Sequence, residues 1–371
     1  MPIIFEIFGY PIDDHSDTAN RFRRLALCPF MDCDCDGGGN RYLSHIHLKN
    51  RPDLALFFPD REIIPSGICS IQLKKDESPW VVCPRRLLVL GHEGMGSRAH
   101  QEYADRKMLA LLGYPSGTHL GVWPEVKIKF NEKIDDVNVL FDYSFDYILM
   151  PLESVSSHQL EQDFDMEWSK IKRMAEKTGY TVARRNGQEY IEDCPSGRPS
   201  IIEIMTSSTS GGDQKKRTAI PLAFEDAILG KTHKAPGINY RQVWARMASQ
   251  MIVKSEVAIR WGGKTIWVVQ DLLANYISSS TALNLKHFIS KHTSEVNMLA
   301  LSYGDGFRKP EGIMELEDSE FYAGPISNRP LDGGPDEISF QDIIRVAAYP
   351  SLRHLRSLLL RKKPTNKILV G

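Results

Sequence analysis

The chain has 371 residues, of which 42% are hydrophobic and 25% charged, a composition typical of a globular protein of two or three domains. This composition excludes a disordered or collagen-like chain, and no apolar run reaches the ~18 residues that a membrane-spanning helix needs. The net charge of −1 excludes a protein drawn to polyanions by its overall field, so a nucleic-acid contact needs local basic patches. The first residues lack a basic start and an apolar stretch, so we expect a cytoplasmic protein without a secretory signal or membrane contact.

The N-terminal part, residues 1–95, is rich in turn formers with short apolar segments between them, which predicts loops, short strands and a thin core. Five of the six cysteines lie there: Cys28, Cys33, Cys35, Cys69 and Cys83. In a reducing compartment such a group favours metal ligation over disulfides, and four thiolates suit zinc or a single iron. His45 or His47 could replace one thiol, and the alternative is a set of free buried thiols.

The rest of the chain alternates helical and strand patterns, which favours a mixed α/β core. Apolar spacing predicts a helix over 98–112, and alternating residues then predict a hairpin with strands at 126–130 and 137–151. Further helices are predicted at 158–179, 239–259, 281–292 and 339–363, the last interrupted at Pro350. Further strands are predicted at 200–205, 266–269 and 297–302.

Three carboxylates, Glu132, Asp146 and Glu203, lie in or beside these predicted strands. An ionised carboxylate in a buried strand needs a compensating cation, because burying it unpaired is costly. Asp146 and Glu203 could bind Mg²⁺ and leave positions for water and a substrate phosphate. The alternative is an ordinary ion pair with Lys or Arg. Asp142 shares a strand face with Asp146 and is the competing carboxylate.

Basic residues gather at 184–185, at 353–363 and at 215–217. Most basic runs on a neutral protein are solvated surface. Lys215, Lys216 and Arg217 follow the strand that carries Glu203, where a phosphodiester backbone would need neutralising. We therefore expect these three residues to contact nucleic acid.

Several segments, in this order, resemble the NotI-type restriction endonucleases, a branch of the PD-(D/E)XK nucleases with a four-cysteine iron site. They are LCPF at 27–30, SGIC at 66–69, WVVCP at 80–84, FNEK at 130–133, SFDYIL at 144–149, IIEIM at 201–205 and ARMASQMIVK at 245–254. The resemblance covers residues 28–270, and we find no secure match beyond about residue 280.

The resemblance implies a mixed α+β fold: a PD-(D/E)XK core sheet flanked by helices, preceded by a small loop-rich unit that binds iron. The implied iron ligands are Cys28, Cys69, Cys83 and either Cys33 or Cys35, of which we expect Cys35 because it opens the turn at 36–40. The implied catalytic residues are Glu132, Asp146 and Glu203. We expect a metal-binding unit at 1–95, a nuclease core at 96–280 with an insertion at about 153–199, and a C-terminal α/β extension at 281–371 for DNA recognition or dimerisation.

One position departs from the family motif. Met205 stands where the motif has Lys or, in NotI-like sequences, Gln, and a thioether can neither stabilise charge nor orient water. Either a second metal and Glu132 replace that group, or the motif is displaced by a strand. The helix at 239–259, with Gln250, is expected to support the site from behind.

The expected function is that of a Mg²⁺-dependent type II restriction endonuclease, a homodimer that cleaves double-stranded DNA at a specific, palindromic site. One alternative is a non-enzymatic DNA-binding protein with a structural cysteine–metal module. Another is a cysteine–metal oxidoreductase.

Overall fold

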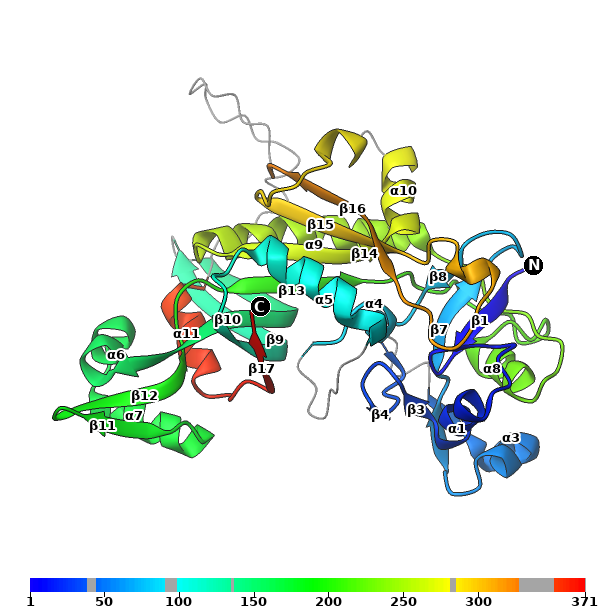
Figure 1. Ribbon diagram of the computed structural model, residues 1–371, viewed down its shortest axis with the longest axis horizontal. Helices are drawn as coiled ribbons and strands as arrows, with labels where there is room; N and C mark the ends of the chain where they lie inside the picture. Colours follow the sequence, from blue (N-terminus) through cyan, green and yellow to red (C-terminus); the bar gives the residue numbers. More distant parts are fainter. Residues whose placement is uncertain (39–44, 91–98, 135–136, 281–284, 327–349, 371) are drawn as a thin grey trace.

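A computed structural model describes the chain apart from residues 39–44, 91–98, 135–136, 281–284, 327–349 and 371. A nine-stranded sheet forms the centre of the molecule and carries helices on both faces (Figure 1). The predicted mixed α/β class, with a multi-strand sheet flanked by helices, is confirmed. None of the described helices combines the length and the apolar content needed to cross a membrane.

The strands of the central sheet lie in the order β11-β12-β10-β13-β14-β15-β16, with β9 beside β10 and β17 beside β9. Their bounds are β9 His119–Ile134, β10 Val137–Ser156, β11 Val182–Arg185, β12 Gln188–Pro195, β13 Ser200–Met205, β14 Lys264–Gln270, β15 Val296–Ser302, β16 Glu317–Gly324 and β17 Asn366–Leu369. β9, β10 and β13 pair antiparallel, whereas β13, β14 and β15 pair parallel. The sheet is therefore mixed.

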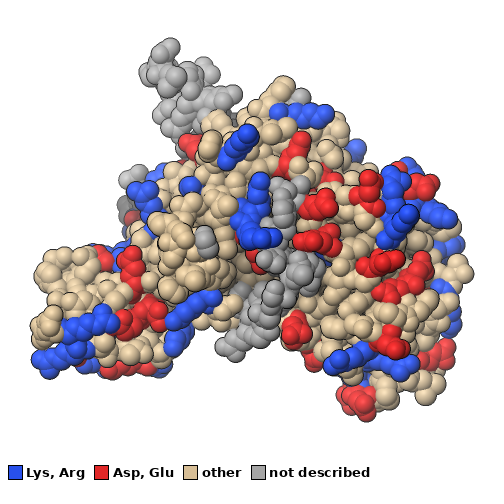
Figure 2. All heavy atoms as spheres, viewed as in Figure 1, with Lys and Arg blue, Asp and Glu red and all other residues tan. Residues whose placement is uncertain are grey.

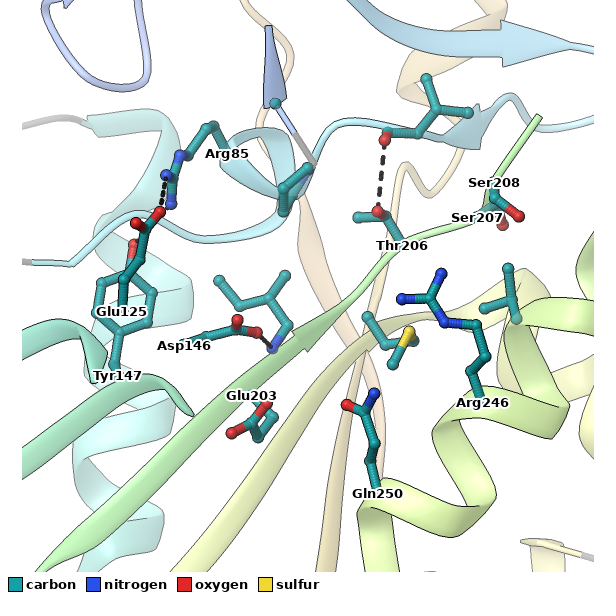
Figure 3. A pocket seen from close by; sticks show the side chains of 16 residues that line it. Arg85, Glu125, Asp146, Tyr147, Glu203, Thr206, Ser207, Ser208, Arg246 and Gln250 are labelled. Carbon is teal, nitrogen blue, oxygen red and sulfur yellow. Dashed lines mark hydrogen bonds and ion pairs between the residues drawn. The ribbon is translucent and has the colours of Figure 1, made fainter. Parts of the chain in front are cut away.

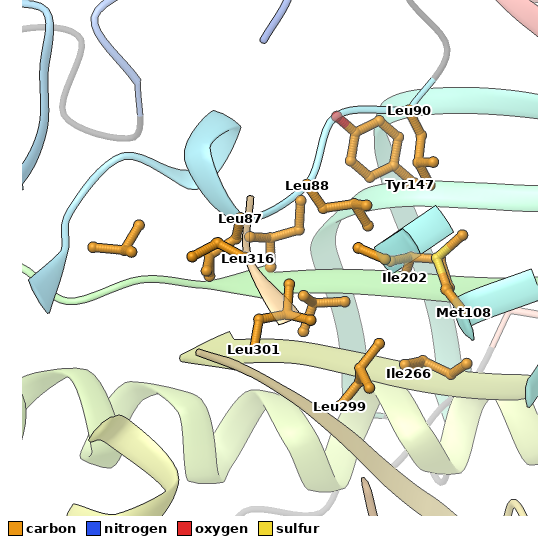
Figure 4. Close-up of a cluster of buried hydrophobic side chains, with 14 of the residues drawn as sticks. Leu87, Leu88, Leu90, Met108, Tyr147, Ile202, Ile266, Leu299, Leu301 and Leu316 are labelled. Carbon is orange, nitrogen blue, oxygen red and sulfur yellow. The ribbon is translucent and has the colours of Figure 1, made fainter. Parts of the chain in front are cut away.

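Helices cover both faces of the middle strands, which explains why β13 and β14 are almost wholly buried apolar runs. These helices are α5 Ala99–Leu112, α9 Tyr240–Arg260, α10 Asp271–Ser280 and α11 Leu352–Leu359. On one face Met108 of α5 belongs to the same buried cluster as Ile202 and Ile266 (Figure 4). On the other face Val257 of α9 and Leu355 of α11 share a cluster with strand residues.

Most predicted elements of the core are present: α5, β9, β10, β13, α9, β14 and β15. The predicted helix at 281–292 is wrong in the described part, where a single 3-10 turn, Leu285–Phe288, forms instead. Residues 281–284 lie outside the described residues. Of the predicted tail at 339–363, residues 339–349 are also outside them, and α11 and β17 follow Pro350.

Residues of the expected insertion form a lobe at one end of the central sheet, at the lower left of Figure 1. It contains β11, β12 and two helices, α6 Ser157–Phe164 and α7 Trp168–Thr178, where one helix was predicted. The break falls at Asp165, whose left-handed backbone ends α6. Phe164 of α6 and Ile171 of α7 belong to a cluster of the lobe's own.

The N-terminal unit is better packed than predicted. It has a sheet of order β2-β1-β7-β8, two small two-stranded sheets and several helices. The bounds are β1 Ile3–Ile7, β2 Tyr10–Pro11, α1 Asp17–Leu25, β3 Leu27–Cys28, β4 Cys33–Asp34, β5 His45–His47, α3 Pro52–Phe57, β6 Ile63–Pro65, β7 Ile68–Gln72, β8 Trp80–Val81 and α4 Pro84–Leu87. The prediction of a thin core is wrong, because a distant helix, α8 (Ile220–Ile228), completes it. Phe224 of α8 packs edge-on against Phe8 and stacks with Phe58.

The expected division at residue 281 does not follow the structure either. β15 and β16 extend the central sheet at one side and β17 at the other, so much of the C-terminal region belongs to the core.

Candidate active site

A cavity of about 360 Å³ opens where β10 and β13 separate. The two strands pair only from Tyr147 to Leu149 of β10, so Asp146 is the first residue beyond the ladder. The lining includes Arg85, Glu125, Asp146, Glu203, Arg246 and Gln250 (Figure 3). The split in the sheet thus brings residues from β9, β10, β13, α4 and α9 to one hollow.

The Asp146 carboxylate accepts a hydrogen bond from β13 at the point where backbone pairing between β10 and β13 has ended. Its Oδ2 accepts a hydrogen bond of 2.8 Å from the backbone N–H of Ile204, in β13. Burial raises the pKa of Asp146 above its ordinary value, against the lowering effects of the Lys254 charge and that hydrogen bond. Asp146 is therefore held in place by the neighbouring strand and faces the cavity.

Glu203 lies on the next strand and is almost completely buried, with 2% of its surface exposed. Its Oε2 accepts a hydrogen bond of 2.5 Å from Nζ of Lys254, whereas Oε1 is buried without a hydrogen-bond partner. Burial raises the pKa of Glu203 to about 8; the Asp146 charge acts in the same direction and the Lys254 charge opposes it. An orphaned carboxylate oxygen beside a second carboxylate is suited to a cation.

Lys254, which extends from α9 and pairs with Glu203, was not singled out from the sequence. Only 3% of its surface is exposed, and its ammonium group lies over the rings of Phe145 and Trp267. Its ammonium group places a positive charge beside Glu203. A signal existed in the sequence, because Lys254 occupies the apolar stripe of α9 with Met247 and Met251 at spacings of seven and three residues.

Two arginines reach the cavity from different elements (Figure 3). Arg85 of α4 lies 3.1 Å from Oδ2 of Asp36 and 3.3 Å from Oε1 of Glu125. Arg246 lies on α9 one turn before Gln250, and both side chains line the cavity. The two guanidinium groups provide positive charge beside the carboxylates.

Glu132 does not join the site, and Glu125 lines the cavity instead. Glu132 pairs with Val139 near the far end of the β9–β10 hairpin and is exposed. It lies seven residues beyond Glu125, roughly 20 Å along an extended strand. Glu125 interrupts the ladder opposite Asp146 with a left-handed backbone, φ 50°. The expected role of Glu132 is therefore not supported by its position.

The other sequence candidates lie outside the cavity. Asp142 is paired with Lys127 at 3.6 Å and with Lys129 at 3.2 Å. This is the ordinary ion pair that was the alternative to metal binding. Arg217 donates two hydrogen bonds to the Asp226 carboxylate. Lys215 and Lys216 are exposed, and neither they nor Arg217 line the cavity.

Four of the five N-terminal cysteines gather in one cluster, in which Cys28, Cys69 and Cys83 are buried and Cys35 is partly buried. Cys33 is exposed and lies outside it. Backbone N–H groups point at two of the sulfurs, from Gly9 to Cys69 at 3.3 Å and from Gly37 to Cys35 at 3.5 Å. Such N–H donors stabilise thiolates.

These four thiols carry no disulfide. Within the described ranges no group of three or more His, Cys, Asp or Glu side chains is arranged to hold a metal ion. The cysteine cluster has the donor chemistry of a structural metal site. The backbone of Gly38 passes close to Cys83, since a Cβ on Gly38 would lie 2.9 Å from Sγ of Cys83.

No protein-family model, curated protein or solved structure matches this chain. The chemistry of the cavity therefore provides the basis for a functional proposal.

Proposed function

We propose that the protein is a Mg²⁺-dependent type II restriction endonuclease that cleaves double-stranded DNA at a specific, palindromic site. The observation that carries this proposal is the buried pair Asp146 and Glu203, with one Glu203 oxygen lacking a hydrogen bond and Lys254 beside it. The segments that resemble NotI-type nucleases of the PD-(D/E)XK superfamily support it. They carry both carboxylates and Lys254.

Asp146 and Glu203 would hold the metal. Mg²⁺ commonly takes only one or two carboxylates from a protein, with water and phosphate oxygens as its other ligands, so a third protein ligand is not required. When bound, the ion polarises the scissile phosphate and lowers the pKa of a bound water.

The remaining side chains of the cavity act on charge and position. Lys254 neutralises Glu203. It would serve as the lysine of the family motif, although it extends from a helix and the motif lysine lies on a strand. Arg246 and Arg85 lie where they can attract the phosphodiester backbone. Gln250 can orient a water molecule from α9.

We propose a separate structural metal, iron or zinc, bound by Cys28, Cys35, Cys69 and Cys83. The gathering of these four cysteines in one cluster and the N–H groups directed at two sulfurs support this ligand set. A closed four-thiolate site has no position for a reacting water, so its role would be to stabilise the N-terminal unit.

A palindromic target implies a homodimer, with one active site for each strand. The test is incubation of mixed genomic DNA with the purified protein, with and without Mg²⁺, followed by sequencing of the DNA ends. Discrete fragments with a common end sequence are expected only with Mg²⁺. DNA retardation without cleavage would instead favour a non-enzymatic DNA-binding protein.

Variants at the two carboxylates sharpen this test. Asp146→Asn and Glu203→Gln should abolish cleavage and leave DNA binding intact, because each removes a metal ligand without changing the protein's outer surface. Asp142→Asn is the matched control and should still cleave. Loss of cleavage in Asp142→Asn with retention in Asp146→Asn would contradict the proposed site.

A further inference from the structure

The overall charge pattern does not single out a DNA-binding surface. In Figure 2 basic and acidic side chains mix over the face in view, and acidic ones gather over the N-terminal unit at the right. The β9–β10 hairpin is a more specific feature, because beyond the cavity its two strands pair only with each other among the described strands.

The outer half of this hairpin pairs with no other described strand. β17 contacts β9 only from His119 to Val122, and β13 and β12 contact β10 only from Tyr147 onward. Over residues 126–134 and 137–145 the two strands therefore form a two-stranded ribbon. It starts at Glu125 and Asp146, the residues that line the cavity.

One face of the ribbon is packed and the other is open. Val126, Ile128, Phe141 and Phe145 are buried in the cluster that includes residues of α9 and α11. The alternate side chains are exposed. We call this exposed row the hairpin face; it includes Lys127, Lys129, Asn131, Lys133, Leu140 and Asp142. Packing on one side fixes the ribbon, so the hairpin face is a preformed surface.

The hairpin face is positive although the whole chain is nearly neutral. Its described residues include three lysines and one aspartate. The pairs of Asp142 with Lys127 and Lys129 are exposed, with both lysine side chains more than half accessible. Exposed pairs of this kind contribute little, typically below about 1 kcal/mol, so these lysines can exchange Asp142 for phosphate.

We propose that the hairpin face lies in the major groove of the DNA substrate and guides the duplex to Asp146; this inference rests on the proposed nuclease function. The major groove admits a two-stranded β-ribbon. Lys127 and Lys129 contact phosphates. Asn131 and Leu140 face base edges: the Asn131 amide can donate and accept hydrogen bonds, and Leu140 can contact a thymine methyl group. Ser144 ends the row two residues before Asp146, so β10 would carry both residues that contact the groove and a residue of the cleavage site.

The test compares two double variants in the Asp146→Asn background, which keeps the DNA uncut. Lys127→Gln/Lys129→Gln alters the hairpin face. Lys74→Gln/Lys231→Gln is the control, because it removes two exposed lysines that are likewise each paired with a carboxylate. Their partners, Glu77 and Asp53, belong to the N-terminal unit. Binding to a short random-sequence DNA duplex is measured by fluorescence anisotropy across a salt series, with thermal unfolding to check the fold.

The hairpin variant should bind at least about ten-fold more weakly, and its slope of log affinity against log salt should fall by about two, one for each lost phosphate contact. The control should keep the parent's affinity and slope. A duplex RNA probe should be insensitive to the hairpin lysines, because the A-form major groove is too narrow for a ribbon.

The inference would be overturned if the hairpin variant bound DNA as tightly as its parent, or if the control lost as much affinity as the hairpin variant. It would also be overturned if the hairpin substitutions weakened RNA binding as much as DNA binding. These outcomes leave the nuclease proposal standing if the unaltered protein cleaves DNA. If the unaltered protein neither binds nor cleaves DNA, the proposed function itself fails.

Discussion

Glu203 and Lys254 form an ion pair with both side chains almost wholly removed from water. Such a pair is not chosen for stability, because the cost of removing two charges from water can exceed their attraction. Here one Glu203 oxygen also lacks a hydrogen bond, and burial raises the pKa of Glu203 to about 8. The arrangement is unfavourable without a cation and becomes favourable when a cation binds, which is why we propose a catalytic role for it.

Lys254→Met should lower the free energy of unfolding by about 3 kcal/mol, because it leaves the Glu203 carboxyl buried without its partner. The double variant Lys254→Met/Glu203→Gln should regain most of that loss, since both charges are gone, yet neither variant should cleave DNA. Urea denaturation in metal-free buffer measures the stability. A double variant as unstable as the single one would contradict the pairing.

The cysteine assignment depends on which thiol near residue 34 enters the cluster. Cys35→Ser should lose the bound metal, whereas Cys33→Ser should retain it, because Cys33 is exposed and is not a member of the buried cluster. Metal analysis of the purified variants decides between them. Full metal content in both variants would contradict the four-thiolate site.

The thiols should also differ in their reactivity. Burial raises the pKa of both Cys28 and Cys194 to about 12, so near neutral pH these groups stay protonated, and only the thiolate reacts with alkylating agents. In the native protein without metal, iodoacetamide should label exposed Cys33 first and leave Cys28 and Cys194 unlabelled. Mass spectrometry reads the order, and early labelling of Cys194 would contradict the packing of the lobe.

Asp146 and Glu203 could be singled out from the sequence because a carboxylate in a buried apolar strand needs a compensating cation. It did not identify Lys254 or Glu125, since their places depend on contacts between distant elements. The Lys254 pair spans 51 residues. Glu125 depends on the hairpin register, which sets it opposite Asp146, whereas local pattern alone favoured Glu132.

At the scale of elements, periodicity located the core helices and strands because each buries a regular face. It could not say what each face packs against. α8 illustrates this, because its apolar side chains indicate burial, but its contact with the N-terminal unit spans more than 160 residues of sequence. For the same reason the sequence underestimated the core of that unit.

Phe224→Ala should lower the free energy of unfolding by about 3–5 kcal/mol, because it opens a cavity between α8 and the N-terminal sheet. Leu56→Ala is the control and should change stability little, since 82% of the Leu56 surface is exposed. Urea denaturation followed by limited proteolysis measures both effects. Faster cleavage of the N-terminal unit in the Phe224 variant is expected, and equal resistance in both variants would contradict this packing.

At the scale of the whole molecule, a buried polar network joins the first strand to the C-terminal third. Glu6 of β1 accepts hydrogen bonds from Arg86 of α4, from Ser70 and from Tyr303. Arg86 also donates to the backbone carbonyl of Met314. The sequence offered no indication of it, because its members are scattered over the chain. The network therefore couples the folding of residues 1–95 to that of the C-terminal third.

Arg86→Met should therefore destabilise the whole molecule by about 3–5 kcal/mol, since it leaves Glu6 as a buried charge without its cation. Arg185→Met is the matched control: it also breaks an Arg–Glu pair, but Arg185 is exposed and Glu192 partly exposed, so the change should cost less than about 1 kcal/mol. Urea unfolding should show one transition in the parent, because the network couples both parts. Adding Glu6→Leu to Arg86→Met should restore most of the stability, since no unpaired charge then remains. A second transition in the parent, or no recovery in the double variant, would show that the network does not join the two parts.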